Sequence, residues 1–118
     1  MAQRVFTHAY HIPGTLAANI TITFKVPFDC QLIHVSANGS NANNAILDIG
    51  YIGALEAYVA NKDVGDSDTP AEVTRTGFVG SQYPHIAAGT LVNIGVDYDG
   101  AAGTAVANFT LVLTFTEG

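Results

Sequence analysis

The chain has 118 residues, of which 48% are hydrophobic and only 12% are charged. This length allows one domain and argues against multidomain or processive enzymes, while the hydrophobic content argues against a disordered acidic tail. Ten acidic residues against four basic ones give a formal net charge of -6, which disfavours nucleic acid and anionic membrane surfaces as partners. We therefore expect a single globular domain over residues 1–118.

The shortage of charged side chains is itself informative about partners. A soluble surface normally carries a quarter to a third charged residues, and a monomer with so few would adhere to its neighbours. The sequence therefore favours a protein whose surface is partly covered by other subunits. Cys30 is the single cysteine, which excludes an internal disulfide and favours a buried position. The first residues lack the apolar run of a signal peptide, so we expect synthesis in a cytoplasm.

The N-terminal segment, residues 1–13, has two interpretations. Its apolar and polar residues alternate, which predicts a strand over Gln3–Tyr10 that forms the edge of a sheet. It can equally be an arm that reaches onto a neighbouring molecule. Under either interpretation the candidate interface residues are Arg4, Phe6 and Tyr10.

Alternation continues along the chain and predicts further strands. From Asn19 to Val26 the apolar residues share one face, which indicates a half-buried strand. The segment Ala54–Lys62 fits either a helix or a strand, because its apolar residues satisfy both spacings. Turn-forming Pro, Gly, Asn and Asp residues separate four more predicted strands, at Gln31–Ala37, Ala45–Tyr51, Glu72–Val79 and Leu91–Tyr98.

The segment Ala105–Phe115 has the longest alternating pattern, with a threonine-rich polar face. We expect it to be a central strand. We also expect it to form an antiparallel hairpin with Leu91–Tyr98, because the connecting residues include Asp-Gly.

Seven or eight short strands with almost no helix predict an all-β fold, an antiparallel two-sheet β-sandwich of jelly-roll type. An immunoglobulin-like sandwich is the alternative, although the chain has no tryptophan.

No pattern in the sequence favours catalysis. None of the four serines lies in a Gly-x-Ser-x-Gly context, and the sequence has no tryptophan to line a glycosidase cleft. His8 and His11 are three positions apart, so on a strand their side chains point to opposite faces. We therefore expect neither an enzyme nor a cofactor.

Two binding alternatives depend on polar residues near turns. Oxygen-rich loops can hold Ca²⁺, although the offsets here do not match an EF-hand and the same carboxylates can accept hydrogen bonds from turn amides. Tyrosines beside Asp and Asn can also form a shallow carbohydrate site, although aromatic residues more often serve the core or a subunit contact. The weak calcium candidates are Asp63, Asp66, Asp68, Asp97 and Asp99.

Three stretches, Val35–Gly50, Val64–Pro70 and Asp97–Gly118, resemble small virion proteins of tailed bacteriophages, in particular head decoration proteins. The resemblance covers about 80 residues as a similarity of style and carries no functional residue across. It implies a β-sandwich that forms trimers or other small oligomers, binds the major capsid protein on the exterior of the virion, and reinforces the shell without catalysis.

The sequence thus gives two expectations for function. The first is a phage capsid decoration subunit that acts through many weak surface contacts. The alternative is a jelly-roll carbohydrate-binding module, with or without calcium.

Overall fold

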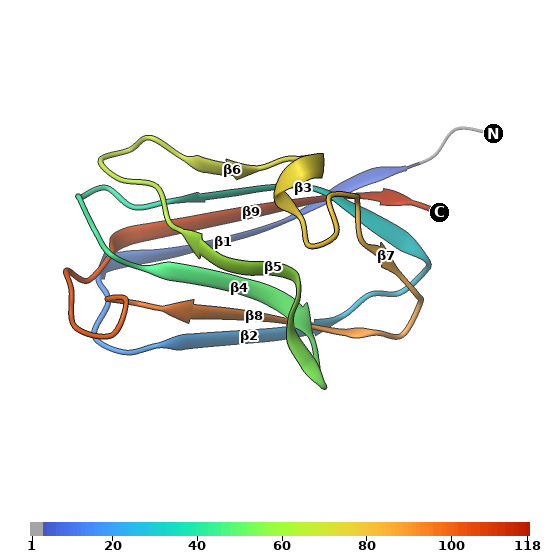
Figure 1. The fold of residues 1–118 in the computed structure, drawn as a ribbon, viewed down its shortest axis with the longest axis horizontal. Helices are drawn as coiled ribbons and strands as arrows, with labels where there is room; N and C mark the ends of the chain where they lie inside the picture. The colour runs from blue at the N-terminus through green and yellow to red at the C-terminus, as the bar shows by residue number, and fades with distance from the viewer. Residues whose placement is uncertain (1–3) are drawn as a thin grey trace.

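The structure, a computed structural model that describes residues 4–118, consists of two antiparallel sheets packed face to face (Figure 1). The predicted all-β, two-sheet sandwich is confirmed. The start of β1 and the end of β9 lie at the same end of the molecule. The elements are β1 (Val5–Thr15), β2 (Ile20–Lys25), β3 (Cys30–Asn38), β4 (Ile46–Tyr51), β5 (Ala54–Asp63), β6 (Ala71–Val73), a 3-10 turn η1 (Arg75–Gly77), β7 (His85–Ile86), β8 (Leu91–Asp97) and β9 (Ala107–Glu117).

The chain passes repeatedly between the two sheets. Sheet A has the strand order β1-β9-β3-β6, with β7 paired to the other end of the same edge of β3. Sheet B has the order β2-β8-β4-β5. All neighbouring strands are antiparallel. The edge strands are therefore β1 and β2 on one side of the sandwich, and β5 with β6 and β7 on the other.

The predicted hairpin between Leu91–Tyr98 and Ala105–Phe115 is wrong, because β8 and β9 belong to different sheets. β9 pairs with β1 and β3, while β8 pairs with β2 and β4, so neither strand has an edge left for the other. The connection crosses from sheet B to sheet A, and a 3.0 Å hydrogen bond from the Val106 amide to the Tyr98 carbonyl fixes its base.

The core lies between the sheets and is centred on β9. This strand is confirmed as long and central, because it runs between β1 and β3 in sheet A. Phe109, Leu111, Leu113 and Phe115 point inward and are 0% exposed. β8 and β4 contribute the opposite half of the core with Leu47, Ile49, Val92 and Ile94, each also 0% exposed. The alternation seen in the sequence is therefore the alternation of core and surface on each strand.

The segment Ala54–Lys62, which fits both a helix and a strand, is the strand β5, antiparallel to β4. Irregularities in the pairing bend this hairpin so that its tip folds back on itself. Gly50 allows the bend, because a Cβ there would lie 2.1 Å from the Ala54 carbonyl oxygen. Pairing with β4 outweighs the helical spacing of Leu55, Tyr58 and Val59.

The predicted strand Glu72–Val79 is shorter in the structure, where β6 ends at Val73 and the 3-10 turn follows. Beyond the turn the chain crosses toward sheet B, and the Val79 amide donates a 2.9 Å hydrogen bond to the Tyr58 carbonyl of β5. Phe78 is buried by this crossing and is 2% exposed. The β5–β6 side of the sandwich is therefore closed by a loop that links the two sheets.

Cys30 is buried and free, as the sequence predicts, and burial raises the pKa of its thiol. Within residues 4–118, no helix is long and apolar enough to cross a membrane.

Candidate functional site

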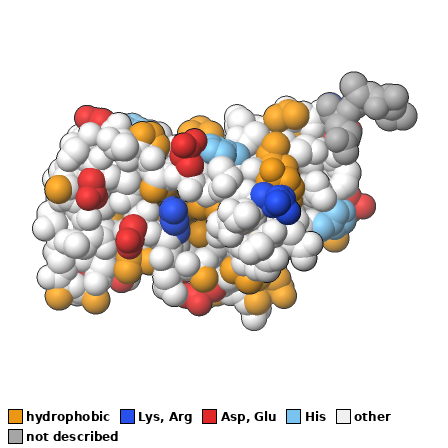
Figure 2. All heavy atoms as spheres, turned by 45° about the horizontal axis from the view of Figure 1, so that its top comes forward, with side chains coloured by type: hydrophobic (Ala, Val, Ile, Leu, Met, Phe, Trp, Pro, Cys, Tyr) orange, Lys and Arg blue, Asp and Glu red, His pale blue; other side chains and the backbone are white. Residues whose placement is uncertain are grey.

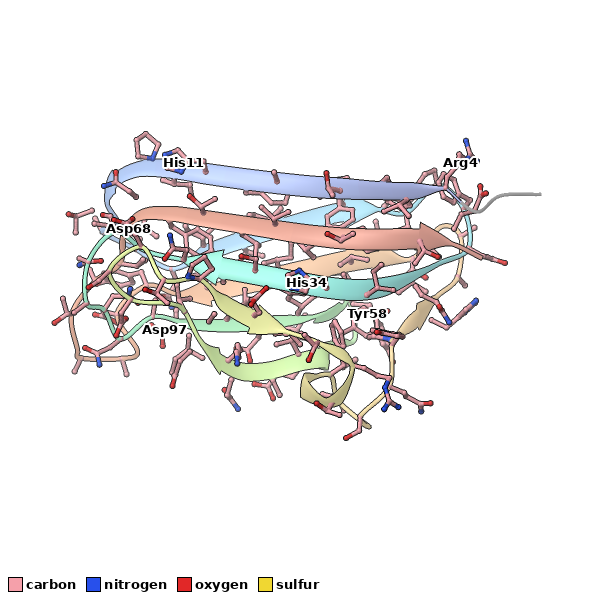
Figure 3. The ribbon with its side chains drawn as sticks, turned by 90° about the horizontal axis from the view of Figure 1, so that it is seen from above. Arg4, His11, His34, Tyr58, Asp68 and Asp97 are labelled. Atoms are coloured by element: carbon pink, nitrogen blue, oxygen red, sulfur yellow. The ribbon has the colours of Figure 1, made fainter. Side chains whose placement is uncertain are left out.

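Of the five aspartates considered for calcium, Asp63 and Asp97 are the last residues of β5 and β8, and the other three lie in loops. Figure 3 places Asp68 and Asp97 at the same end of the sandwich. Across residues 4–118, no three His, Cys, Asp or Glu side chains are grouped closely enough to hold a metal ion. The Asp66 carboxylate instead accepts a 3.0 Å hydrogen bond from the Asn43 amide. Asp97 and Asp99 both accept from the Ala101 amide, at 3.3 and 3.0 Å. These three carboxylates thus support turns through backbone amides.

The polar run Ser40–Asn44 builds the same end of the molecule. The Asn41 side chain donates to the Ala105 carbonyl at 2.9 Å and accepts from the Ala107 amide at 3.0 Å. Asn44 accepts from the Thr104 amide at 2.7 Å. Side-chain amides therefore join the β3–β4 loop to the segment leading into β9, through hydrogen bonds that backbone groups would make in a sheet. The sequence analysis did not predict this structural role. The signal for it was the local density of Asn, which forms such backbone-mimicking hydrogen bonds readily.

The histidines do not converge. His8 and His11 lie on opposite faces of β1, as predicted, with His8 half-buried and His11 exposed. The Nδ1 atom of His11 lies 2.8 Å from the Thr110 hydroxyl, and Nε2 of His34 lies 3.0 Å from a Glu72 oxygen. None of the hydrogen bonds found within residues 4–118 joins a serine to a histidine.

The interface candidates Arg4, Phe6 and Tyr10 all come from the start of the chain, and Val5–Thr15 pairs with β9 as an edge strand. Arg4 forms an ion pair with Glu117, with a 3.1 Å hydrogen bond from Nε, and its guanidinium lies 5.0 Å from the centre of the Phe28 ring. Hydrogen bonding to Arg4 lowers the pKa of Glu117. In Figure 3, Arg4 and His11 mark opposite ends of the strand.

The side of the sandwich formed by β1 and β2 differs from the other sides because its inward-facing residues are only half-buried. We call this side the β1–β2 seam. Its side chains project between the two sheets and remain partly exposed, and at one end the Phe28 ring of the β2–β3 connection meets Phe6 edge to face at 5.3 Å. They are Phe6, His8, Tyr10, Ile12, Leu16, Ile20, Ile22 and Phe24.

Aromatic rings bridge the seam. The His8 ring of β1 stacks on the Phe24 ring of β2 with centroids 4.4 Å apart. Phe6 stacks on the fully buried Phe115 of β9 at 5.0 Å. Burial lowers the pKa of His8 and raises the pKa of Tyr10. The seam is therefore a largely apolar surface whose side chains are held in place by ring contacts.

Two of the hollows in the surface of residues 4–118 lie away from the seam. One, of about 830 Å³, lies beside sheet B and the folded-back tip of the β4–β5 hairpin, with Gly95, Ile52 and Leu55 in its lining. The other, of about 400 Å³, lies between β5 and the loop before β7 and is mainly polar. Its aromatic and polar lining consists of Gln31, Tyr58, Gln82, Tyr83 and His85.

No protein-family model matches the sequence, and no curated protein matches it significantly. The chain is similar to a chain in a solved structure described as "Cyanophage Pam1 capsid asymmetric unit". The two chains are 16% identical, with a TM-score of 0.57, and the match covers 98% of this chain and 85% of the other. At this identity the match establishes a shared fold, over nearly the full length of this chain.

Proposed function

We propose that this chain is a structural protein of a phage virion that binds the outside of the capsid as a decoration subunit and stabilises the shell without catalysis. The observation that carries the proposal is the similarity of fold, over 98% of the chain, to a chain of a phage capsid assembly. The order β1-β9-β3-β6 opposite β2-β8-β4-β5 supports a jelly roll, an architecture common among capsid proteins.

The surface chemistry fits such a role. Only 12% of the residues are charged, and Figure 2 shows Lys, Arg, Asp and Glu side chains scattered singly among uncharged ones. A surface of this kind loses little electrostatic solvation when it is covered by neighbours. We infer that the partners are the major capsid protein and further copies of this chain, forming a trimer or another small oligomer after synthesis in the host cytoplasm.

The test is to mix the purified protein with empty capsids assembled from the major capsid protein of the same phage. Cosedimentation and cryo-electron microscopy then measure the added mass and its position. We expect regular density at symmetry-related sites on the outer surface, together with a higher temperature of capsid rupture. Capsids that gain no density at saturating protein would refute the proposal.

Carbohydrate binding is a second candidate function, favoured by the 400 Å³ hollow beside Tyr58 and Tyr83. Two side-chain amides, an imidazole and exposed tyrosine surface offer both hydrogen bonds and a stacking face for a neutral sugar. A glycan array probed with the wild type and with Tyr83→Ala, with and without EDTA, tests this function. Binding that is lost in Tyr83→Ala supports it, whereas no binding to any glycan refutes it.

A further inference from the structure

We propose that the β1–β2 seam is the surface through which copies of this chain associate with each other. The inference rests on the proposed function in that a decoration subunit acts as an oligomer, and it locates the contact between subunits. Four features of the seam carry it: incomplete burial, free backbone edges, aromatic order and the absence of charge.

The sandwich is closed on one side and open on the other. Eight hydrophobic residues pack against the core while remaining partly exposed, and all but Ala57 belong to β1, β2 or their connection. On the opposite side, Val73, Phe78 and Ile86 are at most 2% exposed, because the crossing loop covers them. Residues of the hydrophobic core therefore reach the surface at the seam, as apolar residues do at the centre of an oligomer interface.

Both strands at the seam have a free edge. Among residues 4–118, β1 pairs only with β9 along its 11 residues, and β2 pairs only with β8 along its 6 residues. Figure 3 shows β1 along the margin of sheet A, with no strand beyond it. Proteins that remain monomeric protect such edges with charged side chains, prolines or covering loops. Here Pro13 lies near the end of β1, within the bulge between Ile12 and Thr15, so most of the edge is unprotected.

The aromatic side chains of the seam are already packed before any partner binds. The ring centroids of His8 on β1 and Phe24 on β2 are 4.4 Å apart, and the ring planes of Phe6 and Phe115 are 10° apart. Rings held in this way lose little conformational entropy on association. The His8 ring makes no hydrogen bond with any other residue in 4–118 and is held by stacking alone.

The distribution of charge identifies the partner as a second copy. Residues Val5–Phe24 contain no Lys, Arg, Asp or Glu, so charge lies only at the ends of the seam, at Lys25, the last residue of β2, and at Arg4, which is paired with Glu117. Two copies that each carry a net charge of -6 repel one another, and they approach at least cost where charge is absent. A cationic partner would instead favour the aspartate-rich end.

The second copy is also the partner available earliest. A neutral, unpaired edge of this length pairs readily with any exposed strand, so a free monomer would aggregate before it reached a shell. Contact between identical seams removes that hazard at the site of synthesis.

The experiment compares one substitution on opposite edges of the sandwich. Ala9 of β1 and Ala60 of β5 are both exposed and both lie on edge strands, so Ala9→Lys and Ala60→Lys are matched variants that keep the fold. Sedimentation velocity over a range of protein concentrations measures self-association. We expect an oligomer for the wild type and for Ala60→Lys. For Ala9→Lys we expect a self-association constant at least about tenfold lower, because each copy brings a charge to the outward face of the free β1 edge, beside the seam side chains.

Hydrogen exchange provides a second readout that needs no variant. The β1 amides that do not bond to β9 should be protected at high protein concentration and should lose that protection on dilution. A monomeric wild type, equal association constants for the two variants, or β1 protection that does not depend on concentration would each overturn the inference.

Capsid binding by the wild type, measured in parallel, separates the two proposals. A monomer that still decorates capsids rejects the seam as a self-association surface and leaves the proposed function intact. An oligomer that dissociates in Ala9→Lys but never binds capsids supports the seam and rejects the proposed function.

Discussion

Phe115 should contribute more to stability than its burial alone accounts for, because it anchors the aromatic side chains of the seam. It is 0% exposed, as is Phe109 on the same strand. Phe115 stacks on Phe6 at 5.0 Å and meets His8 and Phe24 edge to face at 5.7 and 6.1 Å, whereas Phe109 has no aromatic ring pair with any other residue in 4–118. Phe115→Leu and Phe109→Leu therefore remove the same atoms from different surroundings.

The magnitude follows from these three contacts. A Phe→Leu change in a packed core costs about 1 kcal/mol from shape and volume, and we expect that loss at both positions. Each aromatic pair adds about 0.5–1.5 kcal/mol beyond buried area. We take about 0.5 kcal/mol per pair, the low end of that range, because the partner rings are only partly buried. Phe115→Leu should therefore cost about 1.5 kcal/mol more than Phe109→Leu.

Urea unfolding followed by circular dichroism measures the difference. With a slope of about 2 kcal/mol per M, the Phe115→Leu midpoint should lie roughly 0.7 M below that of Phe109→Leu. All three proteins must be compared at one concentration, since association stabilises the folded state. Equal midpoints for the two variants would show that the ring contacts contribute nothing beyond burial.

Three further predictions follow from single positions or ions. Gly50→Ala should lower the free energy of unfolding by about 2–4 kcal/mol, because the new Cβ meets the Ala54 carbonyl oxygen at 2.1 Å; an unchanged melting temperature would contradict the folded-back hairpin. Stability should fall as the pH drops below 6.5, the ordinary pKa of His8, because the unfolded chain then binds a proton that burial denies the folded one. The fall continues down to the lowered pKa of His8, so melting curves of His8→Phe should show a weaker pH dependence than the wild type over this range. EDTA and added CaCl₂ should leave the melting temperature unchanged, because no three potential ligand side chains converge within residues 4–118; a rise with calcium would reveal a site built from backbone oxygens.

Much of the local structure could be predicted from the sequence, because alternation depends only on neighbouring residues. The pattern Ile20, Ile22, Phe24 identified β2, and the longer pattern ending at Phe115 identified β9 as a central strand. Opposite faces for His8 and His11 followed from the same two-residue period.

The pairing of strands could not be predicted in this way. The Asp-Gly turn after β8 suggested a hairpin, yet the partners of β9 are β1 and β3, which lie far away in sequence. The segment Ala54–Lys62 satisfied two periods, and only its hydrogen bonds to β4 decided between them. Short-range signals such as turn residues describe how the chain bends, but not which sheet it then joins.

The sequence by itself determined that the chain is all-β, sparsely charged and free of charged side chains from Val5 to Phe24. Only the tertiary structure decided that β1 and β2 lie side by side at an open edge of the core, so that this neutral stretch becomes one continuous surface. The reason is physical: alternation and charge are properties of adjacent residues, whereas exposure of the core depends on which distant strands pair and which edges are left without a partner.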